Sequence, residues 1–246
     1  MIYTYSQYLD FLLHAKQFGS IIPMRSTTYS PGEIVMRHDV DLDIEPLVKM
    51  AEQEENAGVR STFFILTSCH SYNPRSNYNA GILKNLADGG WEIGLHYDPS
   101  IYRTEDNVLL DEKMRLECRI LEDITGQKVE SISIHIPSLH GEYPFFDGFF
   151  NAYDERIFND FVYMSDSRMN FRGKNPYEFV KRAVEKPLQV LLHPLHFTED
   201  GIGYPDIHAE YIKRHIAHID EEHTKVNSGY AASKNTGLYD YMMRSE

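Results

Sequence analysis

The sequence predicts an α/β protein whose six clear parallel strands form an open or distorted (β/α) barrel. Short runs rich in branched and aromatic residues recur along the chain, at residues 33–39, 61–66, 91–96, 129–136, 161–166 and 188–193. Their starts are spaced by about 30 residues, the length of one strand–helix unit. Helical patterns lie between several of these runs, and alternating strands and helices are typical of a parallel sheet covered by helices.

The connections between the runs contain helical signals. Pro46 suits a first helical turn. Three apolar residues then share one face: Leu47, Met50 and Ala51. A later segment has four such residues at helical spacing, namely Leu110, Met114, Cys118 and Leu121, and Gly126 suits the position after that helix ends. A further helix is expected near the end of the chain, with one apolar side made by Ile212, Ile216 and Ile219.

Composition indicates one globular domain. The chain has 246 residues, 42% hydrophobic and 25% charged, and this length is common for single α/β barrel domains. We expect one domain over residues 1–246, with the polar segment 224–246 as a tail or a partner-binding arm. Cys69 and Cys118 are too few for a disulfide framework or a cysteine-rich zinc module. The net charge of −13 repels phosphate backbones, which argues against nucleic acid as a partner.

The sequence contains no signal for a membrane. No segment approaches the roughly 18 uninterrupted apolar residues that a spanning helix needs. The N-terminal segment has no basic region, and Asp10 interrupts its only apolar run, so an amphipathic helix is expected there and not a signal peptide. These features favour a cytoplasmic protein.

Four of the runs have an apolar face and a second face that ends in aspartate or histidine. Successive strand residues point to opposite sides, so Arg37 and Asp39 share a side that Asp41 continues just beyond the run. The histidines at the corresponding ends of later runs are His96, His135 and His193. Active sites of parallel α/β folds lie at the carboxyl ends of the strands, so these side chains are expected to converge.

The converging residue types suit a divalent cation. A single histidine at a strand end is more often a hydrogen-bonded structural residue than a ligand. Aspartate and histidine gathered from four strands are what a metal site or an acid–base site requires. Imidazole nitrogen and carboxylate oxygen suit Zn²⁺, with Mn²⁺, Fe²⁺ and Co²⁺ as alternatives.

At these residues the sequence resembles the polysaccharide deacetylases, the NodB-homology enzymes of carbohydrate esterase family four. The matching segments follow the family's order between Ile34 and Phe197: IVMRHDVD, STFFIL, GGWEIGLHYD, SISIHIPS and LQVLLHPLHF. The resemblance implies a NodB-like distorted barrel of six to seven strands. It also implies a hydrolase that removes N- or O-acetyl groups from amino sugars and glycans with the help of a divalent metal.

The resemblance assigns roles residue by residue. Asp39 resembles the family's general base and Asp41 its metal ligand, and the reverse assignment stays open. His96 resembles the first metal histidine. His193 resembles the histidine that acts as general acid, and Asp166 resembles an acidic residue near it.

Two positions depart from the family pattern. Ser100 stands where the family has its second metal histidine, and His135 stands where it has an arginine near the base. We expect His135 to be the third ligand because it lies on the polar side of its run. The alternatives are Asp98, His140 and His70. Arg37 is expected to supply the positive charge beside Asp39.

The substrate is expected to be a sugar. Residues 141–155 hold four Phe and two Tyr after the fourth run, where aromatic rings suit sugar faces, with packing onto the barrel as an equal alternative. Tyr97 and Tyr102 are expected to line the cleft beside His96. The candidate substrate-binding residues are Arg37, Tyr97 and Asp166. A cytoplasmic enzyme of this family would act on a nucleotide-linked or lipid-linked sugar precursor.

The leading hypothesis is a metal-dependent amidohydrolase that deacetylates an amino sugar in surface-polysaccharide synthesis. One alternative is a glycoside hydrolase with Asp39 and Glu92 as its carboxylate pair, which would leave the histidines without a role. The other is a glycan-binding relative that has kept the fold and lost the metal.

Overall fold

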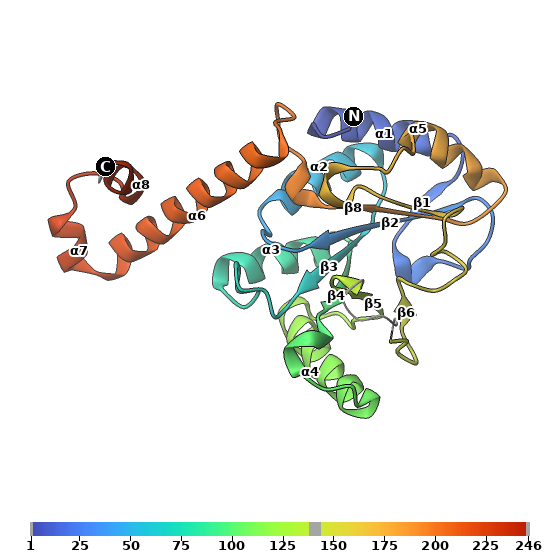
Figure 1. The fold of residues 1–246 in the computed structure, drawn as a ribbon, viewed down its shortest axis with the longest axis horizontal. Helices are drawn as coiled ribbons and strands as arrows, with labels where there is room; N and C mark the ends of the chain where they lie inside the picture. The colour runs from blue at the N-terminus through green and yellow to red at the C-terminus, as the bar shows by residue number, and fades with distance from the viewer. Residues whose placement is uncertain (1, 138–143, 245–246) are drawn as a thin grey trace. The chain divides into compact units, whose positions relative to one another are not determined.

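The computed structural model describes residues 2–137 and 144–244, in two compact units, Met1–Gly201 and Ile202–Glu246. The first unit is built around one sheet in which every strand pairing is parallel (Figure 1). The strand order is β6-β5-β4-β3-β2-β8-β7, and β1 pairs with β2 beside this path. The strands are β1 (Ser20–Ile22), β2 (Glu33–Val40), β3 (Thr62–Leu66), β4 (Glu92–Tyr97), β5 (Ser131–Ile134), β6 (Phe150–Asn151), β7 (Tyr163–Ser165) and β8 (Leu188–Leu192).

The predicted fold class is confirmed. All six predicted runs form strands, and the seven-strand path is open between β6 and β7 in the described part of the chain. Strands β1 and β6 were not predicted, because with three and two residues they are too short for a periodic pattern.

Helices cover the sheet of the first unit. They are α1 (Tyr5–Ala15), α2 (Pro46–Ala57), α3 (Asn77–Asp88), α4 (Asn107–Thr125) and α5 (Pro176–Phe179), with short 3₁₀ turns η1 (Met24–Ser26), η2 (Pro99–Tyr102), η4 (Ser167–Met169), η5 (Val180–Val184) and η6 (Pro194–His196). Helix α1 packs beside α2, and α3 packs beside α4 (Figure 1). As expected, Pro46 lies in the first turn of α2, and Gly126 ends α4 with a left-handed φ of 72°.

The second unit is helical. It consists of α6 (Tyr204–Val226), α7 (Ser228–Ser233) and α8 (Leu238–Met243). The polar segment expected as a tail from residue 224 therefore begins inside α6 and continues into two further helices. None of the described helices is both long and apolar enough to cross a membrane.

The two faces of the sheet differ as strand alternation predicts. On the helix-covered face, apolar side chains such as Ile34, Met36 and Ile93 are buried in large clusters. The inner face instead buries polar side chains, among them Arg37, Asp39, Glu92, Ser133 and Gln189. The barrel interior therefore contains a polar layer that leads up to the carboxyl ends of the strands.

Glu54 of α2 joins four other parts of this fold. Its fully buried carboxylate accepts hydrogen bonds from the Tyr8 hydroxyl, His38 Nε2 and the Ser61 hydroxyl, each at 2.8 Å, and from Trp91 Nε1 at 2.7 Å. These donors come from α1, from β2 and from the residues just before β3 and β4. One carboxylate thus fixes α1 and α2 against three neighbouring strands.

Removing the charge of Glu54 should destabilise the protein strongly. Glu54→Gln leaves several buried donors with a poorer acceptor, so the free energy of unfolding should fall by about 3 kcal/mol. The measurement is urea unfolding followed by circular dichroism. Glu52→Gln is the matched control, because Glu52 is exposed on the same helix, and it should change stability by less than about 0.5 kcal/mol. Equal effects of the two substitutions would contradict this role for Glu54.

Candidate metal centre

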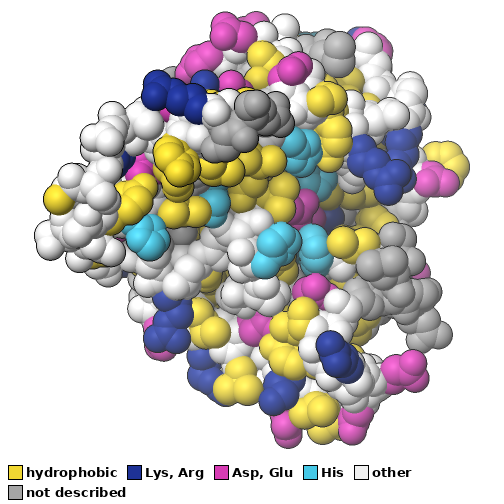
Figure 2. All heavy atoms as spheres, turned by 60° about the vertical axis from the view of Figure 1, so that its left-hand side comes forward, with side chains coloured by type: hydrophobic (Ala, Val, Ile, Leu, Met, Phe, Trp, Pro, Cys, Tyr) yellow, Lys and Arg dark blue, Asp and Glu magenta, His cyan; other side chains and the backbone are white. Residues whose placement is uncertain are grey.

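The sheet order brings the polar strand ends together. Asp41 follows β2, His96 lies in β4, His135 follows β5 and His193 follows β8. Because β5, β4, β3, β2 and β8 are successive neighbours in one parallel sheet, all four residues come to the same edge. Figure 2 shows histidine side chains gathered around acidic side chains at a hollow of this face.

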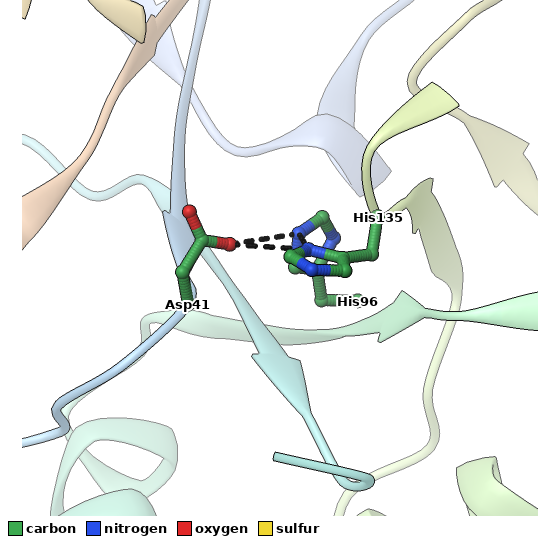
Figure 3. Close-up of side chains that lie close together, drawn as sticks. All are labelled: Asp41, His96 and His135. Atoms are coloured by element: carbon green, nitrogen blue, oxygen red, sulfur yellow. Dashed lines mark hydrogen bonds and ion pairs between the residues drawn. The ribbon is translucent and has the colours of Figure 1, made fainter. Parts of the chain in front are cut away.

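Three of these side chains point their donor atoms at one another (Figure 3). Asp41 Oδ1 lies 3.2 Å from His96 Nε2 and 3.3 Å from His135 Nδ1, and the two ring nitrogens are 3.0 Å apart. Ligands held about 2.0–2.1 Å from a tetrahedral Zn²⁺ lie about 3.3–3.4 Å from each other. The triangle of donor atoms is therefore close to one face of such a coordination shell.

The hydrogen bonds around His96 favour a cation at this point. Nδ1 of His96 lies 3.1 Å from the carbonyl oxygen of Ser133, to which it donates. In the neutral ring, Nε2 then presents a lone pair to the Asp41 carboxylate and to His135. Facing lone pairs repel unless a proton or a metal ion lies between them, and a backbone carbonyl on the second nitrogen is a usual feature of metal-binding histidines.

The charges of the three residues depend on one another. Burial alone would raise the pKa of Asp41, but hydrogen bonds from His135 and His96 and the charges of His96 and His193 hold it well below its usual range. Burial alone would lower the pKa of His96, but the carboxylates of Asp39 and Asp41 raise it. A metal ion at this site must therefore displace protons from histidine, so its affinity should decrease as the pH falls.

Asp39 lies beside this triangle and outside it. Its Oδ2 is 3.3 Å from the Ser133 hydroxyl, 3.7 Å from Arg37 Nη2 and 4.0 Å from His96 Nε2. Among the described residues, its Oδ1 is a buried oxygen without a hydrogen-bond partner. Asp39 therefore has one oxygen held by the protein and one available to a reactant.

Arg37 lies beneath Asp39 inside the barrel and has no exposed surface. Its Nη1 donates to the Ser133 hydroxyl at 2.9 Å, and its guanidinium is 5.2–5.9 Å from the ring centres of Phe64, Tyr153 and Tyr163. Burial alone would lower the pKa of Arg37, but Asp39 and these tyrosines raise it. A permanent positive charge is thus fixed next to Asp39, as the sequence analysis expected.

A second cluster adjoins the first one. Asp166 is fully buried, with Oδ1 at 2.6 Å from His193 Nδ1 and Oδ2 at 2.9 Å from His196 Nδ1. The backbone N–H of His193 also donates to Asp166, at 3.0 Å. Because Nδ1 of His193 is held by Asp166, its Nε2 faces the other cluster and lies 3.8 Å from Asp41 Oδ2. Burial alone would lower the pKa of His193, but Asp166 raises it to about 9.

Three residues expected to contact substrate have other positions. Arg37, Tyr97 and Asp166 are each fully buried. Tyr97 follows His96 in β4, so its ring points to the opposite, helix-covered face, where its hydroxyl donates to the Leu110 carbonyl. The expectation that Tyr97 lines the cleft is therefore corrected. Arg37 and Asp166 contact the candidate catalytic side chains from below.

Two of the other candidate ligands, Asp98 and His70, do not join the triangle. Asp98 caps η2 and accepts hydrogen bonds from the backbone and hydroxyl of Ser100. His70 is exposed and belongs to neither donor cluster of the described residues, and His140 lies outside those residues. Tyr102 hydrogen-bonds to Glu117 and stacks on Tyr97, away from His96.

Glu92 does not suit the carboxylate pair of a glycosidase. It is buried at the start of β4, and its oxygens accept hydrogen bonds from Thr62 Oγ1, Ser131 Oγ and the Arg25 backbone N–H at 2.6–2.9 Å. His96, near the opposite end of the same strand, comes four positions later. In the described part of the aromatic segment 141–155, two neighbouring rings differ in exposure. Phe146 is buried against Tyr97, whereas Phe145 is 61% exposed.

Sequence reasoning missed His196. The signal was present in HPLH, where two histidines are three residues apart and a proline follows the first of them. In the 3₁₀ turn η6 this spacing puts His193 and His196 on the same side, so both reach Asp166.

No family model and no curated protein matches the chain. Solved structures do resemble it. PdaA of Bacillus subtilis, a family 4 carbohydrate esterase, is 14% identical over 82% of this chain and 82% of its own, with a TM-score of 0.46. The chitin deacetylase of Colletotrichum lindemuthianum is also 14% identical, over 76% and 83%, with a TM-score of 0.46.

A third similar structure is a pseudoenzyme. Wild-type BA3943 of Bacillus anthracis, a pseudoenzyme of the CE4 family, is 17% identical over 75% of this chain, with a TM-score of 0.44. This chain spans only 63% of that protein, and 65% of its mutant with restored activity. At these identities and TM-scores the similarity concerns the fold alone, so every role proposed below rests on this chain's own residues.

We predict that His135 contributes to Zn²⁺ binding. His135→Ala removes one corner of the donor triangle and should weaken Zn²⁺ affinity about 10-fold or more, measured by competition with a chromophoric chelator. His70→Ala is the matched control and should leave the affinity unchanged. An unchanged affinity in His135→Ala would show that the three donors do not bind one ion.

We also predict that Asp166 controls the protonation of His193. In metal-free protein labelled with ¹⁵N-histidine, His193 should titrate near pH 9, because the carboxylate stabilises the charged ring. The charged form is present below that pH and is lost as the pH rises through it. Asp166→Asn should lower the pKa of His193 by about one unit or more, whereas Asp160→Asn, an exposed control, should not. A titration of His193 unaffected by Asp166→Asn would contradict the pairing.

Proposed function

We propose that the protein is a metal-dependent hydrolase that removes an N-acetyl or related acyl group from an amino sugar or glycan precursor. The observation that carries this proposal is the separation of tasks at the strand ends. Asp41, His96 and His135 form one donor triangle, while Asp39 and His193 lie next to it with one reactive atom each. Amide hydrolysis needs these three elements together.

The donor triangle suits Zn²⁺, with Mn²⁺, Fe²⁺ and Co²⁺ as alternatives. When bound there, such an ion would polarise a carbonyl group and make water more acidic. Asp41, His96 and His135 would hold it, and Ser133 would keep the His96 ring in the required tautomer through its carbonyl oxygen.

Asp39 is proposed as the general base. Its Oδ1 has no partner among the described residues, so it can accept the proton of the attacking water. Arg37 and Ser133 hold the other oxygen and keep the carboxylate in place. This arrangement supports the base role for Asp39 and the ligand role for Asp41, because only Asp41 lies within the triangle.

His193 is proposed as the general acid. The departing amine must receive a proton, and His193 can donate it from Nε2 while Asp166 holds Nδ1. A pKa of about 9 keeps the ring charged at neutral pH. His196 occupies the second oxygen of Asp166 and so restricts rotation of that carboxylate.

The acyl group and the sugar stay predictions. An amino sugar is inferred from the sequence resemblance. A nucleotide-linked or lipid-linked precursor and a role in surface-polysaccharide synthesis are the finer expectations.

We predict that two substrates with different leaving groups will distinguish the role of Asp39 from that of His193. Asp39→Asn should keep Zn²⁺ bound and reduce turnover about 100-fold or more on both an N-acetylglucosamine oligomer and 4-nitrophenyl acetate, because both reactions need the base. His193→Ala should cause a similar loss on the amide and a small one on the activated ester, whose leaving group needs no proton. Rates and bound zinc are measured for each variant.

Asp98→Asn is the control for this experiment, since Asp98 is partly exposed and caps η2 outside the donor triangle, and it should behave like the wild type. If His193→Ala lost both metal and activity on both substrates, His193 would be a ligand and not the acid. If the wild type with bound Zn²⁺ hydrolysed neither compound nor other acylated amino sugars, the proposed activity would be wrong.

A further inference from the structure

The second unit exposes apolar side chains that its own helices do not cover. Among the described residues of Ile202–Glu246, only Ile207 and Asp220 are buried. Ile212, Ile219 and Val226 of α6 are 54%, 39% and 81% exposed. A segment of this length builds only a small core by itself, so a partner that covers this surface would add stability.

Five exposed residues of α6 and the partly exposed Ile216 follow a heptad pattern. Their spacing alternates between three and four residues, along Ala209, Ile212, Ile216, Ile219, His223 and Val226. This alternation is the signature of a helix that pairs with another helix in a coiled coil. We call these six residues the C-terminal seam. The seam runs over 18 residues of one continuous helix, and its two ends lie about 26 Å apart along the axis.

The neighbouring face of α6 is already occupied within the unit. Asp220 accepts hydrogen bonds from the Tyr230 hydroxyl at 2.6 Å, from Lys234 Nζ at 2.7 Å and from the Leu238 backbone N–H at 3.1 Å. These contacts hold α7 and α8 against the Asp220 side of α6. Ile219, one residue earlier, is turned about 100° away from Asp220 and is left uncovered.

We propose that the C-terminal seam pairs with the same seam of a second copy of this chain, in an antiparallel two-helix coiled coil. In this arrangement Ile216 of one copy packs against Ile219 of the other, and Ile212 packs against His223. The pairing is isologous, so each contact occurs twice about a two-fold axis between residues 217 and 218.

Charge complementarity selects the antiparallel second copy. The positions that flank the seam on the open side are occupied by His215 and Glu222, which are both exposed. In the antiparallel pair His215 of one copy lies beside Glu222 of the other, and its ring can donate to the carboxylate. A parallel pair would instead stack His223 on His223 and place His208 near Lys213.

The first test is the oligomeric state of the full-length protein, by sedimentation velocity from about 1 to 100 µM. The wild type should be a dimer. Ile212→Lys combined with Ile219→Lys puts charge into the seam and should raise the dimer dissociation constant about 100-fold or more. The matched control is Glu210→Gln with Ala217→Lys, which changes the charge equally at exposed positions outside the seam and should remain dimeric.

The second test concerns the partner's identity and direction. Glu222→Lys should weaken the dimer about threefold or more, and adding His215→Glu should restore it, because the swapped charges again face each other in the antiparallel pair. A wild type that is monomeric at 100 µM, or a dimer insensitive to the two isoleucine substitutions, would overturn the proposal. A failure of the charge swap to restore the dimer would overturn the antiparallel pairing. Neither result bears on the proposed deacetylase activity, whose candidate residues all belong to the unit Met1–Gly201.

Discussion

The buried carboxylate of Glu54 is the interaction on which the fold and the candidate site both depend. It is held by four donors from α1, β2 and the starts of β3 and β4. One of these donors, His38, lies between Arg37 and Asp39 in β2. Neighbouring strand residues point to opposite faces of a sheet. Because Glu54 holds the His38 side chain on the helix-covered face, Arg37 and Asp39 must point into the barrel.

Burial inside the barrel fixes the positions of the charged side chains beside the candidate base. Arg37 cannot leave its position among aromatic rings, and its charge is directed at Asp39 and Ser133. Ser133 contributes twice, since its hydroxyl contacts Asp39 and its carbonyl oxygen accepts from His96. The candidate base and the candidate metal ligands thus share one support, so a shift of β5 would disturb both.

Two acid–histidine clusters meet at this edge, and their different surroundings suit them to different tasks. Asp41 is partly exposed and brings two histidine donors to one point, which suits a cation. Asp166 is fully buried and has both oxygens occupied by histidine N–H groups, which suits orientation and charge control of His193. The distance of 3.8 Å between His193 Nε2 and Asp41 Oδ2 brings the two clusters within reach of one small substrate.

The sequence by itself determined six of the eight described strands, the open parallel barrel and most of the converging side chains. Alternation with a period of two is a local property, so it predicted that Asp39, Asp41, His96, His135 and His193 share one edge. The same rule, applied to Tyr97, would have turned its ring away from His96. Only the tertiary structure decided that His135, and not Asp98 or His70, completes the donor triangle, and that His196 shares Asp166. Those outcomes depend on how the segments beyond the strand ends turn. Hydrogen bonds between residues distant in sequence fix those turns, and a periodic pattern within one strand does not predict them.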